Sequence, residues 1–225
     1  AKAPDRKFED FVVETFLPYS ETNKKSFRCD VQICKVLVSH FKGTFLRNFT
    51  PQMIENFKQV FFKKPTRHGK RRSPATVNYH LSVLSKIFSM AIDQDVLEVN
   101  PCKRVKRLRL ENQRMRVLSE SEEEALLEAV GPYTLLRHVI VVALNTGLRK
   151  GEILALKWDD IDFEREVMIV KKSKSGRPRI VPLNNSVLEI LGGRQRNSRF
   201  VFPNPKTGKR LKDVKRSFST ALRNA

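Results

Sequence analysis

Arg149 and Glu152 are the pair of residues in this sequence best suited to chemistry on a phosphate. They follow Gly147, which is expected to end one helix, and they open a second, short apolar helix. Residues three apart on a helix share a face, so the carboxylate can hold the guanidinium in place. A guanidinium fixed in this way can bind a phosphate through two parallel hydrogen bonds. For an R-x-x-E pattern taken alone, a structural ion pair is the competing explanation.

The elements around this pair would give it a rigid support. Apolar periodicity predicts helices on both sides, and a β-branched segment followed by a lysine-rich turn predicts a hairpin. A serine and a glutamate three residues apart form the pattern of a capping box at the first of these helices. In chain order, the predicted elements are a capped helix from Ser119, a buried helix at 134–145, strands at 166–170 and 177–183 around a turn, and helices from Asn184 or Asn185 and at 214–222.

The first hundred residues predict a helical bundle. Phenylalanine and aliphatic residues recur at helical spacing, and Thr50-Pro51 and Ser73-Pro74 are patterns typical of a helix start. The helix from Pro74 carries apolar residues on two faces, including Tyr79, so it should be buried on two sides. The predicted helices lie at 5–17, at 24–42, and after Thr50 and Ser73, and the bundle should end near Asn100.

Two stretches of this part of the chain, the first of which contains Arg149 and Glu152, resemble motifs of a known protein family. TGLRKGEILALKWDDID (146–162) resembles the first arginine box of the tyrosine recombinases, the phage-integrase family. VMIVKKSKSGRPRIVPL (167–183) resembles the β-hairpin of that family, which carries its catalytic lysine. Upstream, residues 73–110 resemble the end of the family's core-binding domain and its interdomain linker. The resemblance covers roughly residues 5–225, and the arginine box together with the hairpin is specific.

The resemblance implies a fold and an activity. The fold would be mainly α with a small antiparallel β-hairpin or sheet, as a helical-bundle core-binding domain plus a truncated α+β catalytic domain. The domains would be a SAM-like DNA-binding domain at 1–102, a basic linker at 103–116 and the N-terminal part of the catalytic domain at 117–225. The activity would be site-specific DNA recombination or integration through a 3′-phosphotyrosine, which requires no cofactor, metal ion or ATP.

The resemblance also implies roles for three residues. Arg149 would clamp the scissile phosphate and Glu152 would support the site. Lys174 would act as the general acid that protonates the leaving 5′ oxygen. Lys171 and Lys172 are rival candidates for this role, because a turn full of lysines is easily misaligned. The S-K-S-G placement favours Lys174.

The sequence departs from the family in one respect. An H-x-x-R box, a further histidine or tryptophan, and the tyrosine nucleophile are all expected after the hairpin. The four histidines and three tyrosines of this chain precede Arg149 instead, and Tyr79 is expected in the core. The chain is therefore expected to be an inactive DNA-binding fragment with apolar surface uncovered at 139–144. The alternative is a natural non-catalytic protein that competes for recombination sites.

The charge supports a polyanionic partner. Lys plus Arg number 44 against 24 Asp plus Glu, a net charge of +20, while 40% of the residues are apolar. This excess predicts double-stranded DNA as partner, together with other recombinase protomers in a synaptic complex. General RNA binding is the third possibility, but the phenylalanines follow helical stripes and form no exposed stacking platform. No membrane partner is expected, and three cysteines without metal spacing favour a reduced, cytoplasmic protein.

Basic segments provide the candidate phosphate contacts. Residues 103–116 hold seven basic side chains and one acidic side chain, which reads as a linker lying on phosphates. A second basic segment precedes the helix from Pro74, and the polar residues at the start of that helix could approach a groove. The candidate DNA-binding residues are Lys70, Arg71, Arg72, Thr76, Asn78, His80, Lys103, Arg104, Lys106, Arg107 and Arg109.

Overall fold

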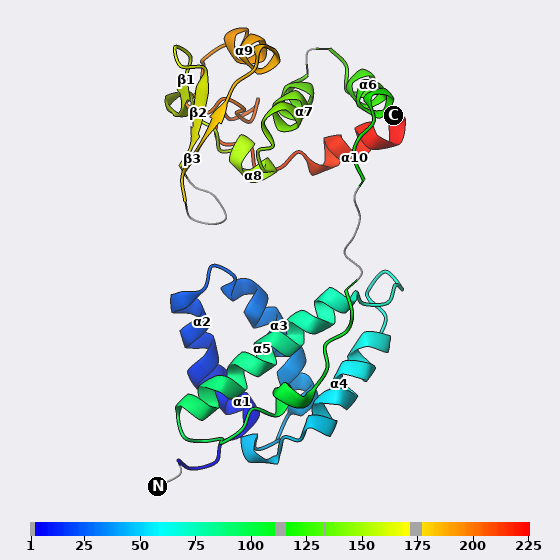
Figure 1. Cartoon of the computed structure of the whole chain (residues 1–225), viewed down its shortest axis with the longest axis vertical. Helices are drawn as coiled ribbons and strands as arrows, with labels where there is room; N and C mark the ends of the chain where they lie inside the picture. Colours follow the sequence, from blue (N-terminus) through cyan, green and yellow to red (C-terminus); the bar gives the residue numbers. More distant parts are fainter. Residues whose placement is uncertain (1–2, 111–115, 133, 172–176) are drawn as a thin grey trace. The chain divides into compact units, whose positions relative to one another are not determined.

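The computed structural model describes residues 3–110, 116–132, 134–171 and 177–225. The chain divides into two compact units, Ala1–Arg114 and Met115–Ala225, which are described separately (Figure 1). The first unit is helical and the second combines helices with a small sheet. The predicted fold class, mainly α with a small antiparallel sheet, is therefore confirmed. Within the described residues, no helix combines the length and the apolar run that crossing a membrane would need.

The first unit is a bundle closed around phenylalanines. Phe8, Phe41, Phe49 and Phe88 are buried, with ring centroids 4.9 to 6.4 Å apart. The predicted stripes thus form a core rather than a stacking surface. The helices of this unit are α1 (Phe8–Phe11), continued through a π-helical turn (Val12–Phe16) into α2 (Leu17–Asn23), then α3 (Phe27–Phe41), α4 (Pro51–Lys63) and α5 (Pro74–Asp93), with short 3-10 turns at Leu46–Asn48 and Pro101–Arg104.

Two helix starts in this unit follow the predicted capping chemistry. The Thr50 hydroxyl accepts a hydrogen bond from the Met53 amide, and the Ser73 hydroxyl accepts one from the Thr76 amide. The prediction that Tyr79 lies in the core is wrong, since this residue is 42% exposed while Val83 and Ile87 on the same helix face are buried. The second face of α5 is therefore covered along only part of its length.

The second unit places helices against a three-stranded sheet. Its elements are α6 (Glu120–Val130), α7 (Leu135–Thr146), α8 (Lys150–Ile153), β1 (Ile161–Asp162), β2 (Val167–Val170), β3 (Arg179–Pro182), α9 (Asn185–Gly192) and α10 (Lys215–Asn224), with a 3-10 turn at Trp158–Asp160. The strands are antiparallel in the order β1-β2-β3, and Val170 pairs with Arg179. The sequence patterns predicted β2 and β3 but missed the two-residue β1.

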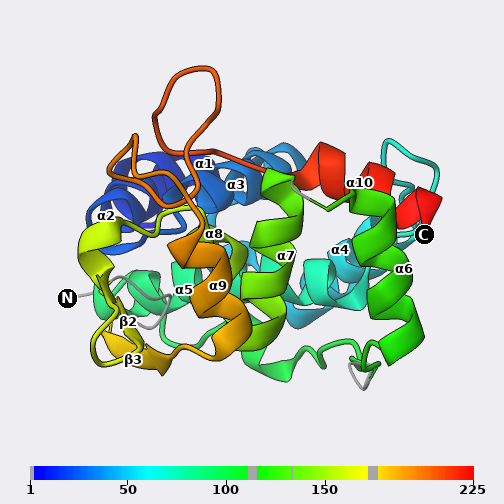
Figure 2. The same ribbon diagram turned by 90° about the horizontal axis from the view of Figure 1, so that it is seen from above.

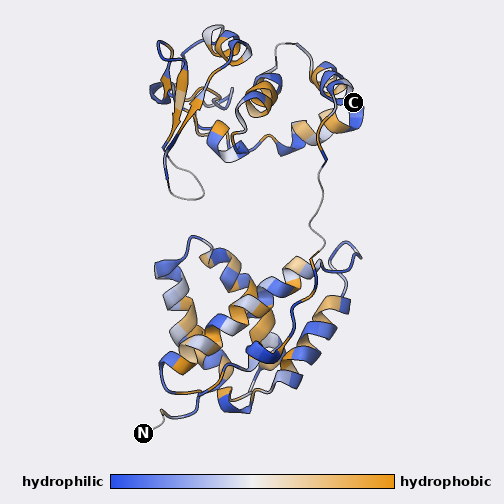
Figure 3. Ribbon diagram, in the orientation of Figure 1, coloured by the Kyte–Doolittle hydropathy of each residue, from blue (hydrophilic) through white to orange (hydrophobic). Residues whose placement is uncertain are grey.

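Burial in the second unit centres on α7, the sheet and α9. Helices α7 and α9 lie side by side (Figure 2), and hydrophobic residues concentrate on α7, β2 and β3 (Figure 3). The Ser119–Glu122 capping box is confirmed, with both of its hydrogen bonds present. The expectation of uncovered apolar surface at 139–144 is largely wrong, because Val139, Ile140 and Val142 are buried by neighbouring elements. Leu144 is the exposed large side chain of that segment.

Candidate functional site

The turn between α7 and α8 delivers Arg149 to the surface. Gly147 caps α7 with φ of 61°, a left-handed conformation that costs glycine little. The Thr146 hydroxyl donates to the Val142 carbonyl and accepts from the Leu148 amide at 3.4 Å, which fixes the chain direction after the cap. Arg149 then stands immediately before α8, and its φ and ψ of −68° and 146° are extended. The sequence therefore encodes this geometry locally.

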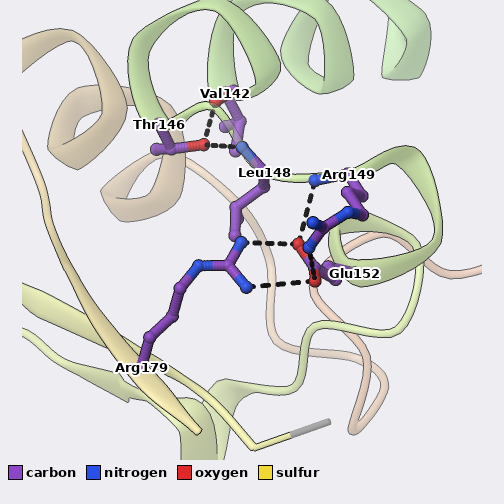
Figure 4. A network of polar contacts seen from close by, with 6 residues as sticks. All are labelled: Val142, Thr146, Leu148, Arg149, Glu152 and Arg179. Carbon is purple, nitrogen blue, oxygen red and sulfur yellow. Dashed lines mark hydrogen bonds and ion pairs between the residues drawn. The ribbon is translucent and has the colours of Figure 1, made fainter. Parts of the chain in front are cut away.

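Glu152 is the centre of a hydrogen-bond network around Arg149 (Figure 4). Its Oε2 accepts from the Arg149 backbone amide at 2.9 Å, and its Oε1 accepts from Arg149 Nη1 at 3.1 Å. Arg179, from β3, donates Nη1 to Oε1 at 3.1 Å and Nη2 to Oε2 at 2.7 Å. Glu152 is only 8% exposed at its side chain, whereas Arg149 is 56% exposed. One carboxylate thus holds two arginines and leaves Arg149 accessible.

The electrostatics of Glu152 follow from these contacts. Hydrogen bonding by Arg179 is the largest cause of a lowered pKa, which falls to about 2. Burial opposes this change, and the backbone amide and side chain of Arg149 reinforce it. Hydrogen bonds to the charged form of a carboxylate stabilise that form. Glu152 therefore stays ionised throughout the physiological pH range and keeps its two cations in place.

This ionisation predicts a pH-dependent stability. The folded pKa of about 2 lies below the ordinary value of 4.5, so Glu152 stabilises the fold above pH 4.5 and loses that effect as pH falls toward 2. Glu152→Gln should lower the free energy of unfolding at pH 7 by about 1–2 kcal/mol, after allowance for the partly exposed partners. Urea denaturation at pH 7, 5 and 3 should show this difference shrinking with acidity. Glu164→Gln, at an exposed turn, is the control, and a constant difference would contradict the assignment.

A cleft of about 570 Å³ adjoins Arg149. Two of its basic side chains are tethered: Lys171 Nζ lies 2.6 Å from Asp160 Oδ1, and Arg210 donates to the carbonyls of Gly151 and Leu154 at 3.0 and 3.3 Å. The Asp160 hydrogen bond raises the pKa of Lys171. Lys174 and Lys172 lie outside the described residues. The basic residues lining the cleft are Arg149, Lys157, Lys171 and Arg210.

Sequence reasoning missed Arg179, although the strand pattern held a signal for it. Val181 and Leu183 are buried while Ile180 is 67% exposed, so every second residue of this strand faces inward. Arg179 falls on the inward side, where a charged residue needs a partner. The strand pattern shows that Arg179 needs a partner. It does not show that this partner is Glu152, which lies 27 residues earlier.

The basic segment before α5 is only partly available to a ligand. Lys70 and Arg71 are exposed. Arg72 stacks over the Phe61 ring at 4.4 Å and donates to the carbonyls of Lys64 and Pro65. Two of the three predicted phosphate contacts in this segment are therefore exposed side chains, and the third also stabilises the loop.

The residues expected to approach a groove divide in the same way. Thr76 is exposed, but Asn78 and His80 are buried. His80 Nδ1 bonds to the Thr76 carbonyl at 2.8 Å, and its ring packs 4.4 Å from that of Phe61. Burial lowers the pKa of His80. In this structure His80 and Asn78 contact the protein interior and do not present their side chains to a ligand.

Asn78 holds the start of the basic linker against α5. Its side-chain amide donates to the Leu108 carbonyl at 2.8 Å and accepts from the Leu108 amide at 2.9 Å. Arg107 donates to the Asn78 carbonyl and to Ser82 Oγ, and Lys58 Nζ donates to the Lys106 carbonyl at 2.8 Å. The linker thus begins as an irregular segment held along the first unit by these hydrogen bonds. The candidate residues that it displays as exposed are Lys103, Arg104, Lys106, Arg107 and Arg109.

Removal of the Asn78 side-chain amide should loosen the linker segment at Leu108. Asn78→Ala deletes two hydrogen bonds to the Leu108 backbone and should cost about 1–2 kcal/mol. We expect faster hydrogen exchange at the Leu108 amide and a lower urea midpoint for the first unit. Asn56→Ala, which removes an exposed amide from α4, is the matched control. Unchanged exchange at Leu108 would mean that the linker is held by other contacts.

Family models match both halves of the chain. The phage integrase SAM-like domain matches residues 7–107, and the phage integrase family model matches residues 116–225. The shufflon-specific DNA recombinase of Escherichia coli is 35% identical over 127 residues, which are 56% of this chain and 33% of that protein. The ICEBs1 integrase of Bacillus subtilis is 41% identical over 131 residues, 58% of this chain and 34% of that protein. The chain thus spans about one third of the length of these relatives.

Solved structures share the fold. The Tn1549 transposon integrase, in complex with transposon right end DNA, matches with a TM-score of 0.82 and 18% identity over 97% of this chain and 78% of that chain. A lambda integrase dimer bound to a COC' core site matches with a TM-score of 0.78 and 18% identity over 98% of this chain and 63% of that chain. With the arginine box, the hairpin and both family models in agreement, the chain belongs to the phage integrase family of tyrosine recombinases.

Proposed function

We propose that this chain supplies the DNA-binding surface and half of the catalytic site of a site-specific tyrosine recombinase. The observation that carries this proposal is the exposed Arg149 guanidinium beside a cleft with further basic residues. The guanidinium is held by the Glu152 carboxylate, whose side chain is 8% exposed. A cation positioned before the reaction can stabilise negative charge that develops on a phosphoryl oxygen. Arg149 would bind the scissile phosphate, and Glu152 would keep its guanidinium aimed at the cleft.

The reaction would cleave and rejoin DNA without an external energy source. A tyrosine hydroxyl would attack the phosphate, form a 3′-phosphotyrosine and release a 5′ hydroxyl, and a second 5′ hydroxyl would reverse the step. The leaving oxygen must gain a proton, and we assign this role to Lys174. The ion pair between Lys171 and Asp160 disfavours Lys171 as the acid, because it ties up the ammonium group and raises its pKa.

The nucleophile and the second arginine box would come from residues outside this sequence. The tyrosines of the sequence are Tyr19, Tyr79 and Tyr133, and all three precede Arg149. None stands at a position that matches the family's nucleophile. We therefore propose that these 225 residues bind duplex DNA without becoming covalently attached to it.

Duplex DNA and further protomers are the proposed partners. The neighbouring solved structures include a lambda integrase dimer bound to a core site and a tetramer bound to a Holliday junction. In this chain, the exposed cations of the linker and of the loop before α5 would contact phosphates, which gives affinity without sequence choice. The basic excess, +20, favours the same partner.

Binding and trapping assays test this proposal. A gel shift should show tighter binding to duplex DNA than to structured RNA of equal length. Nicked duplexes that trap phosphotyrosine should give no covalent band with this chain, and a band with a chain extended through the second arginine box. A denaturation-resistant band from the 225 residues, lost on tyrosine replacement, would refute the half-site assignment. An extended chain that binds but never cleaves would favour the non-catalytic competitor.

A further inference from the structure

We propose that Arg179 is a positioning residue for the reaction: its two-pronged contact locks the Glu152 carboxylate in the one orientation that leaves Arg149 free to bind phosphate. This inference rests on the proposed function. Arg179 belongs to β3 and Glu152 to α8, and Arg149 lies at the start of that helix. Figure 4 shows Glu152 between the two guanidinium groups.

Glu152 accepts hydrogen bonds from two arginines. Each carboxylate oxygen receives one N–H from Arg179, at 3.1 and 2.7 Å. Oε1 also accepts from Arg149 Nη1, and Oε2 accepts from the Arg149 amide. A carboxylate offers about four acceptor positions, and this one receives four donors. Arg149 can therefore contact Glu152 through one side-chain nitrogen, while Nε and Nη2 make no hydrogen bond to a described residue.

The orientation of the carboxylate decides how Arg149 is used. An arginine beside a carboxylate can pair with it through two parallel bonds when nothing else holds the carboxylate. Such a pairing would turn the Arg149 guanidinium toward Glu152 and occupy donors needed for phosphate. Arg179 already donates one hydrogen bond to each carboxylate oxygen. The two-pronged contact is therefore made by Arg179, and the Arg149 side chain keeps a single hydrogen bond to Glu152.

The position of Arg179 in the sheet makes this contact rigid. Arg179 pairs with Val170 in the β2–β3 ladder, and its side chain is 35% exposed beside the 8% exposed Glu152. The guanidinium fork is planar and preorganised, so it fixes both the place and the plane of the carboxylate. The hairpin that leads to the proposed acid Lys174 is thereby joined to the helix that follows Arg149.

A structural ion pair would predict something different. In that case substitution of Arg179 would lower stability and leave Arg149 chemistry intact once the protein is folded. A positioning role predicts that cleavage falls while duplex affinity and fold are retained. It also predicts that substitution of Arg179 does not lower the cleavage rate further once the Glu152 carboxylate has been removed, since Arg179 acts through that carboxylate.

The experiment compares Arg179→Met, which keeps the aliphatic stem, and Arg179→Lys, which keeps the charge without the fork. Arg165→Met, at an exposed turn with a 3.8 Å contact to Asp162, is the matched control. Carbon-13 NMR of the Glu152 carboxyl in this chain, assigned with Glu152→Gln, should show its pKa rising from about 2 by about one unit or more in Arg179→Met. An unchanged titration would overturn the inference whatever the cleavage result.

Cleavage is measured in the chain extended through the second arginine box. Arg179→Met and Arg179→Lys should each reduce the single-turnover rate by about 100-fold, with the dissociation constant for duplex DNA within about threefold. Adding Arg179→Met to Glu152→Gln should change the rate little further. Full rescue by Arg179→Lys, additive losses in the double variant, or normal cleavage by a folded Arg179→Met would each overturn the positioning role. If the unsubstituted extended chain does not cleave, the proposed function fails instead, and the NMR titration still decides whether Arg179 holds Glu152.

Discussion

Replacement of Arg149 by alanine should abolish strand cleavage in a chain extended through the second arginine box. The loss should reach about 1,000-fold, because a preorganised cation at the developing phosphoryl charge contributes about 4 kcal/mol to transition-state stabilisation. Arg149→Lys should also cleave poorly, since an ammonium cannot reproduce the two-pronged grip on a phosphate. Single-turnover cleavage of a labelled duplex measures the effect.

The fold should survive these substitutions. Arg149 is 56% exposed, and Glu152 keeps its two-pronged contact with Arg179 when Arg149 is lost. Thermal melting and duplex affinity should therefore stay close to those of the unsubstituted chain. Arg165→Ala removes a more exposed arginine, with 83% of its side chain accessible against 56% for Arg149, from a turn of the same unit and should cleave normally. Near-normal cleavage by Arg149→Ala would make the arginine structural only.

Removal of the linker cations should have the largest effect on DNA binding. The start of the linker, which is held against the first unit, exposes four basic side chains: Lys103, Arg104, Lys106 and Arg107. Each phosphate that they neutralise contributes a slope of about −0.9 to the log–log dependence of affinity on salt. The quadruple alanine variant should therefore bind all duplex sequences about 10- to 100-fold more weakly and lower the magnitude of that slope by about 3. Titrations between 50 and 200 mM salt would measure both.

Asn78→Ala is the control that distinguishes loss of positive charge from loss of linker structure. It releases the linker segment at Leu108 without removing a cation, so the salt slope should be unchanged even if affinity falls. Arg107 also bonds to Asn78 and Ser82, so its single substitution should cause less loss of slope than that of Lys103. A quadruple variant that keeps the original slope would remove the linker from the DNA interface.

The sequence by itself determined the local features of this protein. Gly147 had to end a helix, Ser119 and Glu122 had to cap one, and Glu152 had to lie close to Arg149, three residues before it. Each of these results depends on residues within about one helical turn, where spacing fixes geometry. The strands β2 and β3 followed for the same reason, because alternation and β-branching act along one segment.

The tertiary structure alone decided which distant groups meet. Arg179 reaches Glu152 across 27 residues, and Asn78 reaches Leu108 across 30. A polar residue near a helix start reads the same in sequence whether it faces DNA or clamps the chain, so Asn78 was expected at a groove. Tyr79 shares an apolar stripe with Val83 and Ile87 yet stays exposed, since a stripe gives the direction of a side chain and not how far the neighbouring elements extend. Periodicity in the sequence shows which side chains of a helix or strand need burial or a polar partner. Only the packing of the folded chain decides which residues bury or bond to them.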